Sequence, residues 1–219
     1  MNLDHVNKQL RRLHQSKKLK YVITYPAIEI ETKINPRLVN LTGIIYNLKN
    51  FRIDEIIQRK EFHHYHEQGK ASRNFIFVQG SDEVWIKEKT FRKLHYTPFK
   101  VPILLRQEKK IRPGDSNYHK LFLDTLNWQH VGSFYKECVD ISFWFENLLF
   151  TVTFMNAILG KSILSQIELE FDGHSSNIKR PSIKKITAAF DTVSQSLIRQ
   201  VNNKYFTSLT KLEWLKGLK

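Results

Sequence analysis

The stretch that decides the fold is Ile28-Glu29-Ile30-Glu31-Thr32-Lys33-Ile34. Isoleucine alternates with charged residues along most of it, and a period of two is typical of a β-strand with one apolar and one charged face. Glu29, Glu31 and Lys33 therefore project from the same face. Two carboxylates about 6.5–7 Å apart on a strand repel each other unless a cation lies between them. The pattern indicates a cation site next to a lysine.

A second pair of carboxylates, Glu168 and Glu170, lies late in the chain on another expected strand, from Ile163 to Phe171. Hard cations such as Mg²⁺ prefer oxygen ligands, and a nearby lysine can hold a phosphate oxygen as a point charge. If the fold brings the two strands together, the four glutamates form one cluster. Removing one crowded carboxylate should then relieve repulsion in the metal-free protein.

The strands expected between these two also carry one charged and one apolar face. The charged faces hold the following residues: Lys87 and Lys89; Arg106, Glu108, Lys110 and Arg112; Lys136 and Asp140. One explanation is an antiparallel sheet with one side in water. The other is a closed barrel of about eight strands, whose charged faces surround one small ligand and whose apolar faces lie under helices.

Helices with apolar stripes are expected at both ends of the chain, and they need an apolar surface to cover. Residues 1–20 predict a basic amphipathic helix, and Pro36 is expected to open a helix of roughly 20 residues that reaches Ile57. Residues 174–219 predict C-terminal helices, the longer one opened by Pro181. With a β-rich block from Phe62 to Glu170, we expect one α+β domain over residues 1–219, an antiparallel eight-stranded barrel with helices outside.

Composition excludes several classes of protein. The hydrophobic content of 41% indicates a globular chain, and one cysteine, Cys138, excludes an intramolecular disulfide and a cysteine-based zinc site. No phosphate-binding P-loop or dinucleotide-binding glycine motif is present. The net charge of +14 attracts anions such as nucleic acid, nucleotides or polyphosphate. No segment has the apolar length of a membrane span or a secretory signal, so we expect a cytoplasmic protein without a membrane partner.

Together the Glu29-Glu31-Lys33 strand, the basic strands and the Glu168-Glu170 strand resemble the CYTH superfamily, the triphosphate tunnel metalloenzymes. The resemblance covers the layout of about residues 21–200, and each motif is only a few residues long. It implies an eight-stranded barrel with a charged tunnel and a reaction on a triphosphate with Mg²⁺ or Mn²⁺. Activities in that superfamily include RNA 5′-triphosphatase, thiamine triphosphatase, tripolyphosphatase and a class of adenylate cyclase.

The resemblance also implies roles for individual residues. The first motif looks like the first metal-binding motif of the metal-dependent RNA triphosphatases, and Ile167 to Glu170 looks like their last. The four glutamates would hold the metal and, with Lys33, form the catalytic set. The expected phosphate contacts are Lys33, Lys87, Lys89, Arg106 and Lys136.

Two positions depart from the family pattern. Lys87-Glu88-Lys89 stands where the family usually has Arg-x-Arg. Thr151 and Thr153 stand on the strand that usually carries an aspartate before the last glutamate pair. Glu108 or Asp140 could supply the missing carboxylate, either by orienting a ligand or by activating water.

We therefore expect a metal-dependent phosphohydrolase that removes the terminal phosphate of RNA 5′-triphosphate, a nucleoside triphosphate, thiamine triphosphate or tripolyphosphate. One alternative is a class IV-type adenylate cyclase on the same fold. The other is a non-catalytic basic nucleic-acid-binding module that stacks bases on Trp85, Tyr118 and Trp144. The enzyme requires the four glutamates to converge, and the module does not. The oligomeric state is not indicated.

Two further candidates are weaker. His63, His64 and His66 suggest zinc, but no cysteine and no clear third ligand lie nearby. Cys138 on a strand is more typical of an inert core thiol than of a nucleophile.

Overall fold

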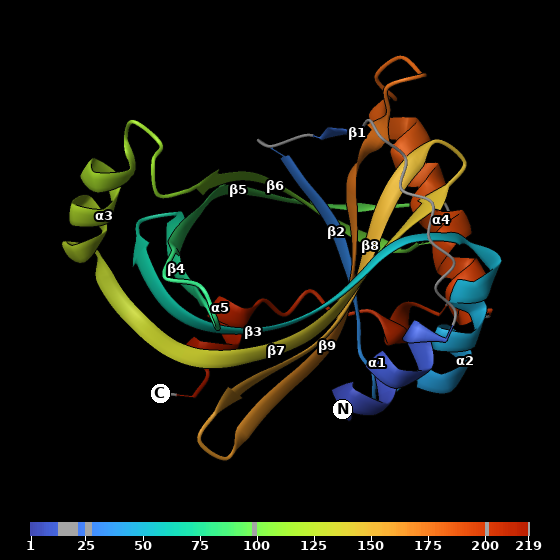
Figure 1. The fold of residues 1–219 in the computed structure, drawn as a ribbon, viewed down its shortest axis with the longest axis horizontal. Coiled ribbons are helices and arrows are strands. Elements are labelled where there is room, and N and C mark those ends of the chain that lie inside the picture. The colour runs from blue at the N-terminus through green and yellow to red at the C-terminus, as the bar shows by residue number, and fades with distance from the viewer. Residues whose placement is uncertain (13–21, 25–27, 98–99, 200–201, 219) are drawn as a thin grey trace.

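A closed antiparallel barrel forms the centre of the molecule (Figure 1). The computed structural model describes residues 1–218 except 13–21, 25–27, 98–99 and 200–201. Its barrel strands are β2 (Ile28–Ile34), β3 (Arg52–Gln68), β4 (Ala71–Val78), β5 (Val84–Tyr96), β6 (Pro102–Ile111), β7 (Gln129–Phe145), β8 (Leu148–Leu159) and β9 (Ser162–Ser175).

The strand order around the barrel is β2-β6-β5-β4-β3-β7-β8-β9, and β9 pairs back onto β2. The first and last strands of the barrel are therefore neighbours. Because the ring is closed, its strands have no free edge to pair with another chain. A short additional strand, β1 (Val22–Thr24), pairs with the end of β9, where the backbone of Ile23 passes close to Gly173.

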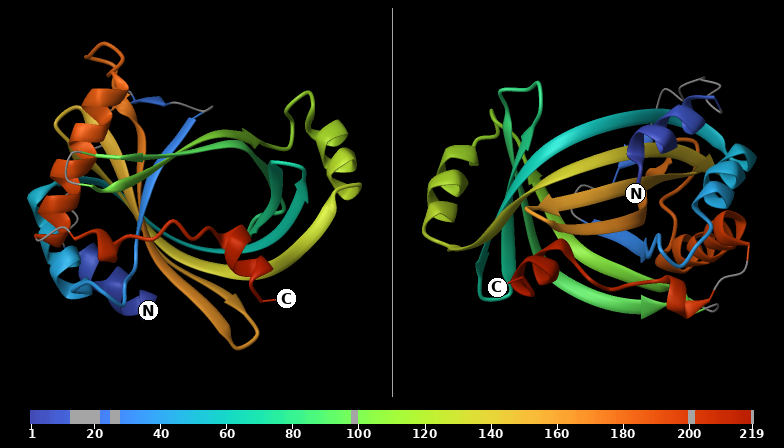
Figure 2. Two further views of the ribbon diagram at one scale, coloured as in Figure 1. Left: turned by 180° about the vertical axis from the view of Figure 1, so that it is seen from behind. Right: turned by 90° about the horizontal axis from the view of Figure 1, so that it is seen from below.

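Three helices cover one side of the barrel: α1 (Leu3–Arg11), α2 (Leu41–Asn47) and α4 (Ile183–Ile198) (Figures 1 and 2). Their apolar faces and the outer faces of the strands form the main core. Phe190 of α4, for example, packs edge-to-face on Phe150 of β8 with ring centroids 5.2 Å apart. The apolar strand faces therefore lie outside, under helices, and the charged faces lie inside.

Two other helices lie elsewhere on the barrel. Helix α3 (Tyr118–Leu126) packs its Tyr118 and Phe122 on a small cluster formed by β4, β5 and β6. Helix α5 (Lys211–Lys216) follows a segment that crosses the barrel opening (Figure 2). Two short 3₁₀ turns, η1 (Leu48–Asn50) and η2 (Asn203–Tyr205), complete the described elements.

The structure confirms the α+β class and the eight-stranded barrel with helices outside, and it corrects three element predictions. The helix expected after Pro36 is wrong: α2 has seven residues, and a strand of 17 residues begins at Arg52. Ile56 and Ile57 lie on this strand, which pairs with β7 along nearly its whole length. Strand pairing and the β-preference of branched side chains outweigh the helix-like spacing.

The terminal helices are shorter than expected, and one helix was missed. Residues 174–175 still belong to β9, and Phe206 bridges to Ile34 instead of being helical, so only α4 and α5 form C-terminal helices. The N-terminal helix ends at Arg11, and residues 13–20 of that prediction lie outside the described residues. Helix α3 was not predicted. None of the described helices is long and apolar enough to cross a membrane.

Leu197 and Leu123 form a matched pair that tests the core. Leu197 on α4 is 1% exposed, and Leu123 on α3 is 62% exposed. We expect Leu197→Ala to lower the free energy of unfolding by about 2–5 kcal/mol, because it leaves a cavity between helix and barrel. Leu123→Ala should change it by less than about 0.5 kcal/mol. Urea unfolding of both variants measures this, and equal losses would contradict the packing described above.

Candidate active site

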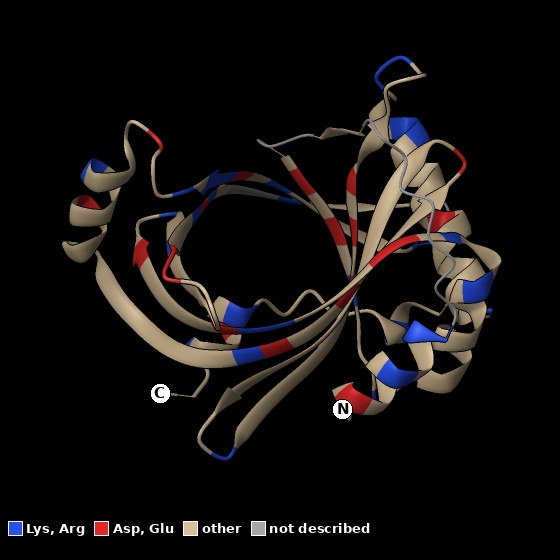
Figure 3. Cartoon of the chain, viewed as in Figure 1, with Lys and Arg blue, Asp and Glu red and all other residues tan. Residues whose placement is uncertain are grey.

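The two glutamate motifs lie side by side where the barrel closes. Glu31 on β2 is paired with Glu170 on β9, and Lys33 is paired with Glu168. On the other side of β2, Glu29 is paired with Arg106 of β6. Paired residues of adjacent strands share a face, so these side chains all point into the barrel. The four glutamates converge, as the enzyme interpretation required. Figure 3 shows acidic and basic positions on the strands around the opening.

Lys33 joins the two motifs, and Arg106 joins the two glutamates of the first motif. The Lys33 Nζ lies 3.0 Å from Glu31 Oε1 and 2.5 Å from Glu168 Oε1, and Lys33 is 2% exposed. The Arg106 guanidinium lies 2.8 Å from Glu31 and 3.3 Å from Glu29. Although burial opposes it, Glu168 and Glu31 keep the pKa of Lys33 above its usual value. Both cations are therefore charged and held inside the barrel.

The other predicted phosphate contacts also lie in the interior. Lys89 Nζ lies 2.8 Å from each oxygen of Glu29, and Lys87 lies 2.8 Å from Glu108. Lys136 on β7 donates to Glu61 over 3.2 Å. The five cations predicted from sequence thus share one interior, and each has a carboxylate partner there.

Glu108 and Asp140, the predicted supporting carboxylates, hold cations. Glu108 lies between Lys87 and Lys89, the latter at 3.2 Å. Asp140 accepts a hydrogen bond from Thr153 over 2.7 Å and pairs with Arg59. Arg59 also pairs with Glu61 at 2.9 Å, a carboxylate that the sequence did not single out. These contacts position basic side chains along the barrel wall.

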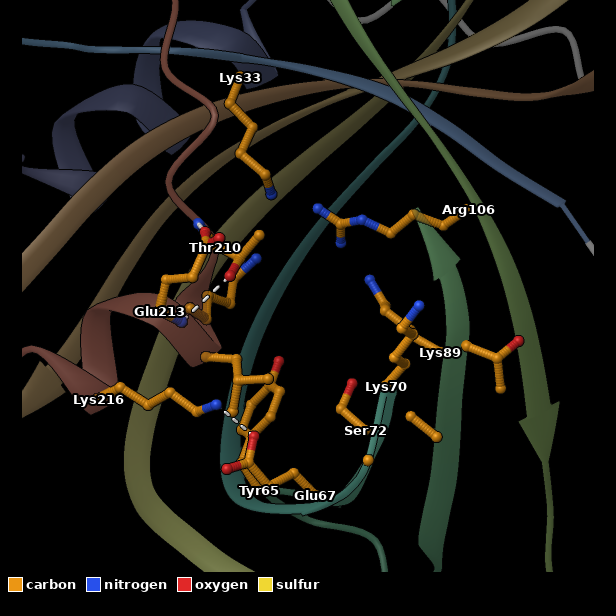
Figure 4. A pocket seen from close by; sticks show the side chains of 15 residues that line it. Lys33, Tyr65, Glu67, Lys70, Ser72, Lys89, Arg106, Thr210, Glu213 and Lys216 are labelled. Carbon is orange, nitrogen blue, oxygen red and sulfur yellow. Dashed lines mark hydrogen bonds and ion pairs between the residues drawn. The ribbon is translucent and has the colours of Figure 1, made fainter. Parts of the chain in front are cut away.

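The interior contains two adjoining cavities. One, of roughly 130 Å³, is lined by the motif residues Glu29, Glu31, Glu168 and Glu170 and by Lys87 and Lys136. The other, of roughly 280 Å³, is lined by Lys33, Arg106 and residues of the C-terminal segment (Figure 4). Tyr65, Lys89 and Lys211 line both cavities. The charged space therefore continues from the glutamate cluster towards α5.

The C-terminal segment adds a cation that sequence reasoning missed. Lys211 Nζ lies 2.7 Å and 2.9 Å from the two oxygens of Glu168. Burial, reinforced by Lys33, lowers the pKa of Lys211 to about 8. Nothing in the sequence identifies Lys211, because its contact with Glu168 depends on the path of the backbone across the opening.

Backbone and apolar contacts fix this path. The Thr207 amide donates to the Lys33 carbonyl over 3.0 Å, and the Gln166 side chain donates to the Leu209 carbonyl over 2.8 Å. A capping box between Thr210 and Glu213 starts α5 (Figure 4), and Leu215 packs against Gly132. The segment is anchored on both sides of Lys211.

Glu170 and Asp172 are two neighbouring acidic side chains of the interior, and both have raised pKa values. Burial, together with Glu29 and Asp172, raises the pKa of Glu170 to about 8. Burial and Asp140 raise the pKa of Asp172 to about 6, although a hydrogen bond from Thr151 opposes the rise. Asp172 was missed, yet the alternation Glu168-x-Glu170 continues to it without a break.

Thr151 and Thr153 explain the departure from the family pattern on β8. Thr151 donates to Asp172 of β9, and Thr153 donates to Asp140 of β7. Strand β8, which has no carboxylate of its own, therefore contacts one carboxylate of β9 and one carboxylate of β7. The acidic character expected at this place in the barrel is kept by different residues.

The three histidines and Cys138, the weaker candidates of the sequence, are not part of the group formed by Glu29, Glu31, Glu168 and Glu170. His63 lies inside, 2.9 Å from Glu61 and next to Asn74, and burial lowers its pKa to about 4. His64 and His66 alternate onto the outer face. In the part of the chain that the structure describes, no group of three or more His, Cys, Asp or Glu residues is placed so that it could hold a metal ion. Cys138 is buried among apolar side chains, and burial raises the pKa of its thiol.

Comparisons with known proteins support the fold. No family model and no curated protein matches the sequence. Among solved structures, a proposed adenylyl cyclase from Hippeastrum, described as revealing a dominant triphosphatase activity, matches with a TM-score of 0.57 and 11% identity over 88% of this chain and 96% of that one. The chain shares the fold of this protein.

Two further structures agree. A conserved hypothetical protein from Pyrococcus furiosus matches with a TM-score of 0.56 and 12% identity, over 84% of this chain and 98% of that one. A proposed adenylate cyclase from Vibrio parahaemolyticus matches with a TM-score of 0.52 and 10% identity, over 87% and 99%. At such identities the likeness establishes the tunnel fold, and the activity has to be argued from the site.

The chemistry of the donors fits a hard divalent cation. Glu29, Glu31, Glu168, Glu170 and Asp172 supply only carboxylate oxygens, the ligands that Mg²⁺ and Mn²⁺ prefer. Burial is the largest cause of the raised pKa values of Glu170 and Asp172, and crowding by neighbouring carboxylates adds to it. A cation would relieve that crowding.

Glu168 and Glu170 make a matched pair for a stability test in EDTA. Removing Glu168 leaves Lys33 and Lys211 facing each other, so Glu168→Gln should lower the free energy of unfolding at pH 7 by about 3 kcal/mol. The relief of repulsion expected from the sequence therefore does not apply to Glu168. Glu170→Gln should raise the free energy of unfolding at pH 7 by about 1–3 kcal/mol.

The pH dependence follows from the pKa of Glu170, which rises from 4.5 to about 8 on folding. Between these values the folded state binds more protons than the unfolded state, so the wild type loses stability as pH rises through this window. The gain from Glu170→Gln should be larger at pH 8 than at pH 5. Urea unfolding at both values measures it. Equal effects of the two substitutions would contradict the assigned charge pairing.

Proposed function

We propose that this protein is a metal-dependent triphosphatase that cleaves the terminal phosphate of a triphosphate inside its barrel. The observation that carries the proposal is the arrangement of cations around the glutamate cluster. They come from β2, β5, β6, β7 and α5, and they are Lys33, Lys87, Lys89, Arg106, Lys136 and Lys211. Such a spread of positive charge matches an extended polyanion better than one phosphate group.

The existing ion pairs define what kind of ligand the site accepts. Each cation contacts a carboxylate, as Lys89 does with Glu29 and Lys33 with Glu168. A phosphate chain alone would displace carboxylates from their cations and leave buried negative charge, which is costly. A metal alone would leave the lysines unpaired. A metal–triphosphate complex supplies both kinds of partner at once. Its phosphates pair with the lysines and arginine, and its metal pairs with the carboxylates, so neither the cations nor the carboxylates of the protein are left unpaired.

The side chains of the chain then have distinct roles. Lys33, Arg106 and Lys89 neutralise the phosphate oxygens and hold the triphosphate in line, which is the larger part of catalysis in phosphoryl transfer. Glu29, Glu31, Glu168 and Glu170 would hold Mg²⁺ or Mn²⁺. When bound, the cation would polarise the terminal phosphoryl group and lower the pKa of a bound water. Asp172 adds a fifth carboxylate to this set.

The supporting residues keep the cations in place. Glu108 holds Lys87 and Lys89, and Asp140 with Glu61 holds Arg59. We propose these positioning roles for Glu108 and Asp140 in place of water activation. The closed interior also limits access of bulk water, which strengthens each of these electrostatic contacts. The cytoplasmic location expected from the sequence is part of this proposal.

A direct assay tests the activity. We expect release of phosphate from tripolyphosphate, ATP or triphosphorylated RNA with Mg²⁺ or Mn²⁺ and none in EDTA. Glu31→Gln should lower kcat at least about 100-fold, because it removes charge next to Lys33 and Arg106 in the site. Glu137→Gln, at a surface pair with Lys60, is the control and should keep wild-type activity. No phosphate release from any of these substrates would overturn the proposal, and cyclic nucleotide formed from ATP would indicate a cyclase instead.

Calorimetry tests whether the metal and the triphosphate bind together in place of the internal ion pairs. We expect Mg²⁺ to tighten binding of a non-hydrolysable tripolyphosphate analogue to the wild-type protein by about 10-fold or more, and the analogue to tighten Mg²⁺ binding by the same factor. Orthophosphate should bind weakly with or without metal, because it cannot pair with cations along the whole interior. Independent binding of the metal and the analogue, or equal affinity for the analogue and orthophosphate, would favour a general basic surface.

A further inference from the structure

A tryptophan, Trp85, lines the largely charged wall of the cavity, together with Tyr65, His63 and Ile76. Trp85 lies on the same face of β5 as Lys87 and Lys89, and it lines the cavity that holds the four glutamates. A phosphate chain has no use for an indole ring, because it offers the ring neither an apolar surface nor a cation. The ring therefore indicates a part of the ligand other than its phosphates.

The surroundings place Trp85 at the rim of the cavity. Lys110, whose side chain is 56% exposed, and the exposed Arg112 line the same cavity. Ile76 of β4, directly paired with Trp85, also lines it and extends the apolar surface. Lys87 and the four glutamates of the cluster line the same cavity. A ligand that enters with its phosphates first would leave its other end beside the ring.

Two contacts hold the ring in position. The indole Nε1 donates a hydrogen bond to Glu83 over 2.9 Å, and the Arg112 guanidinium lies 5.1 Å from the ring centroid. Trp85 is partly exposed, so one region of the ring remains accessible. Its two companions in the nucleic-acid interpretation are less suited, because Trp144 is 4% exposed and the Tyr118 hydroxyl is bonded to the Val84 carbonyl.

The spacing along β5 fits a nucleotide. Residues two apart on one face of a strand are separated by about 7 Å. This separation between Trp85 and Lys87 is comparable to the sugar that joins a base to its first phosphate. Lys89, a further step along the same face, continues the row of cations under the later phosphates.

We propose that Trp85, with Ile76 and Arg112, forms a stacking platform for the nucleobase of a nucleoside 5′-triphosphate group. This inference rests on the proposed function and names its substrate class. Bases stack on aromatic rings whatever their identity, so the platform accepts several bases. The neighbouring Arg112, Lys110 and Lys87 repel a cationic ring, so the platform disfavours a thiazolium such as that of thiamine triphosphate.

Steady-state kinetics on three variants test the platform. Trp85→Leu should lower kcat/KM for ATP and GTP roughly 10-fold or more, and leave tripolyphosphate within about twofold, because tripolyphosphate has no base. Trp85→Phe keeps an aromatic face and should retain most of the activity on nucleotides. Tyr135→Leu, which removes an aromatic ring 62% exposed on the outer wall, is the control and should change neither.

The substrates distinguish the possible sources of the base. Triphosphorylated RNA oligonucleotides and free nucleotides share the 5′-nucleoside triphosphate, and a Trp85-dependent preference for either supports the platform. Equal losses on ATP and tripolyphosphate for Trp85→Leu, or a preference for thiamine triphosphate over ATP, would overturn it.

A binding measurement keeps this inference separate from the catalytic proposal. ATP should quench tryptophan fluorescence in the wild type and not in Trp85→Phe, and tripolyphosphate should quench it in neither. If no substrate is hydrolysed but this quenching is seen, the triphosphatase proposal fails and the platform stands. If tripolyphosphate and ATP are hydrolysed equally well and no quenching is seen, the platform fails alone.

Discussion

The contact on which the site depends is the closure of the barrel between β2 and β9. This pairing places Lys33 between Glu31 of its own strand and Glu168 of the partner strand. Side chains alternate along a strand, so a register shift of one residue would turn every charged side chain of β9 towards the helices. The apolar faces of both strands lie in the main core, so burial outside the barrel and charge pairing inside it specify the same register.

A charged interior imposes a second constraint, because buried charges are stable only when they are paired. The barrel meets this constraint by pairing opposite charges of neighbouring strands: Glu29 contacts Lys89 and Arg106, and Glu108 contacts Lys87. The wall is thus not a uniformly positive tube. A ligand has to offer both signs of charge to replace these pairs, and this requirement narrows the choice of ligand more than the net charge of the protein does.

Residues that alternate on a strand could be predicted from the sequence, and residues placed by tertiary contacts could not. Glu29, Glu31, Glu168 and Glu170 share faces of their strands, so the alternation was sufficient, and it would also have reached Asp172. Helix α2 and strand β3 were merged because Ile56 and Ile57 continue a helix-like spacing, whereas their conformation depends on pairing with β7. Lys211 reaches Glu168 only through the path of the C-terminal segment, to which no local pattern corresponds.

The Lys33–Glu168 contact joins residues 135 positions apart, and Lys211 reaches the same carboxylate from a segment 43 residues further along the chain. A growing polypeptide therefore holds all of β2 long before it has the strand that completes the binding site. Contacts between such distant segments form late and slowly in folding. Until β9 emerges, Glu31 and Lys33 lack their partners from that strand. The candidate site is thus complete only after both β9 and the segment that carries Lys211 have been made.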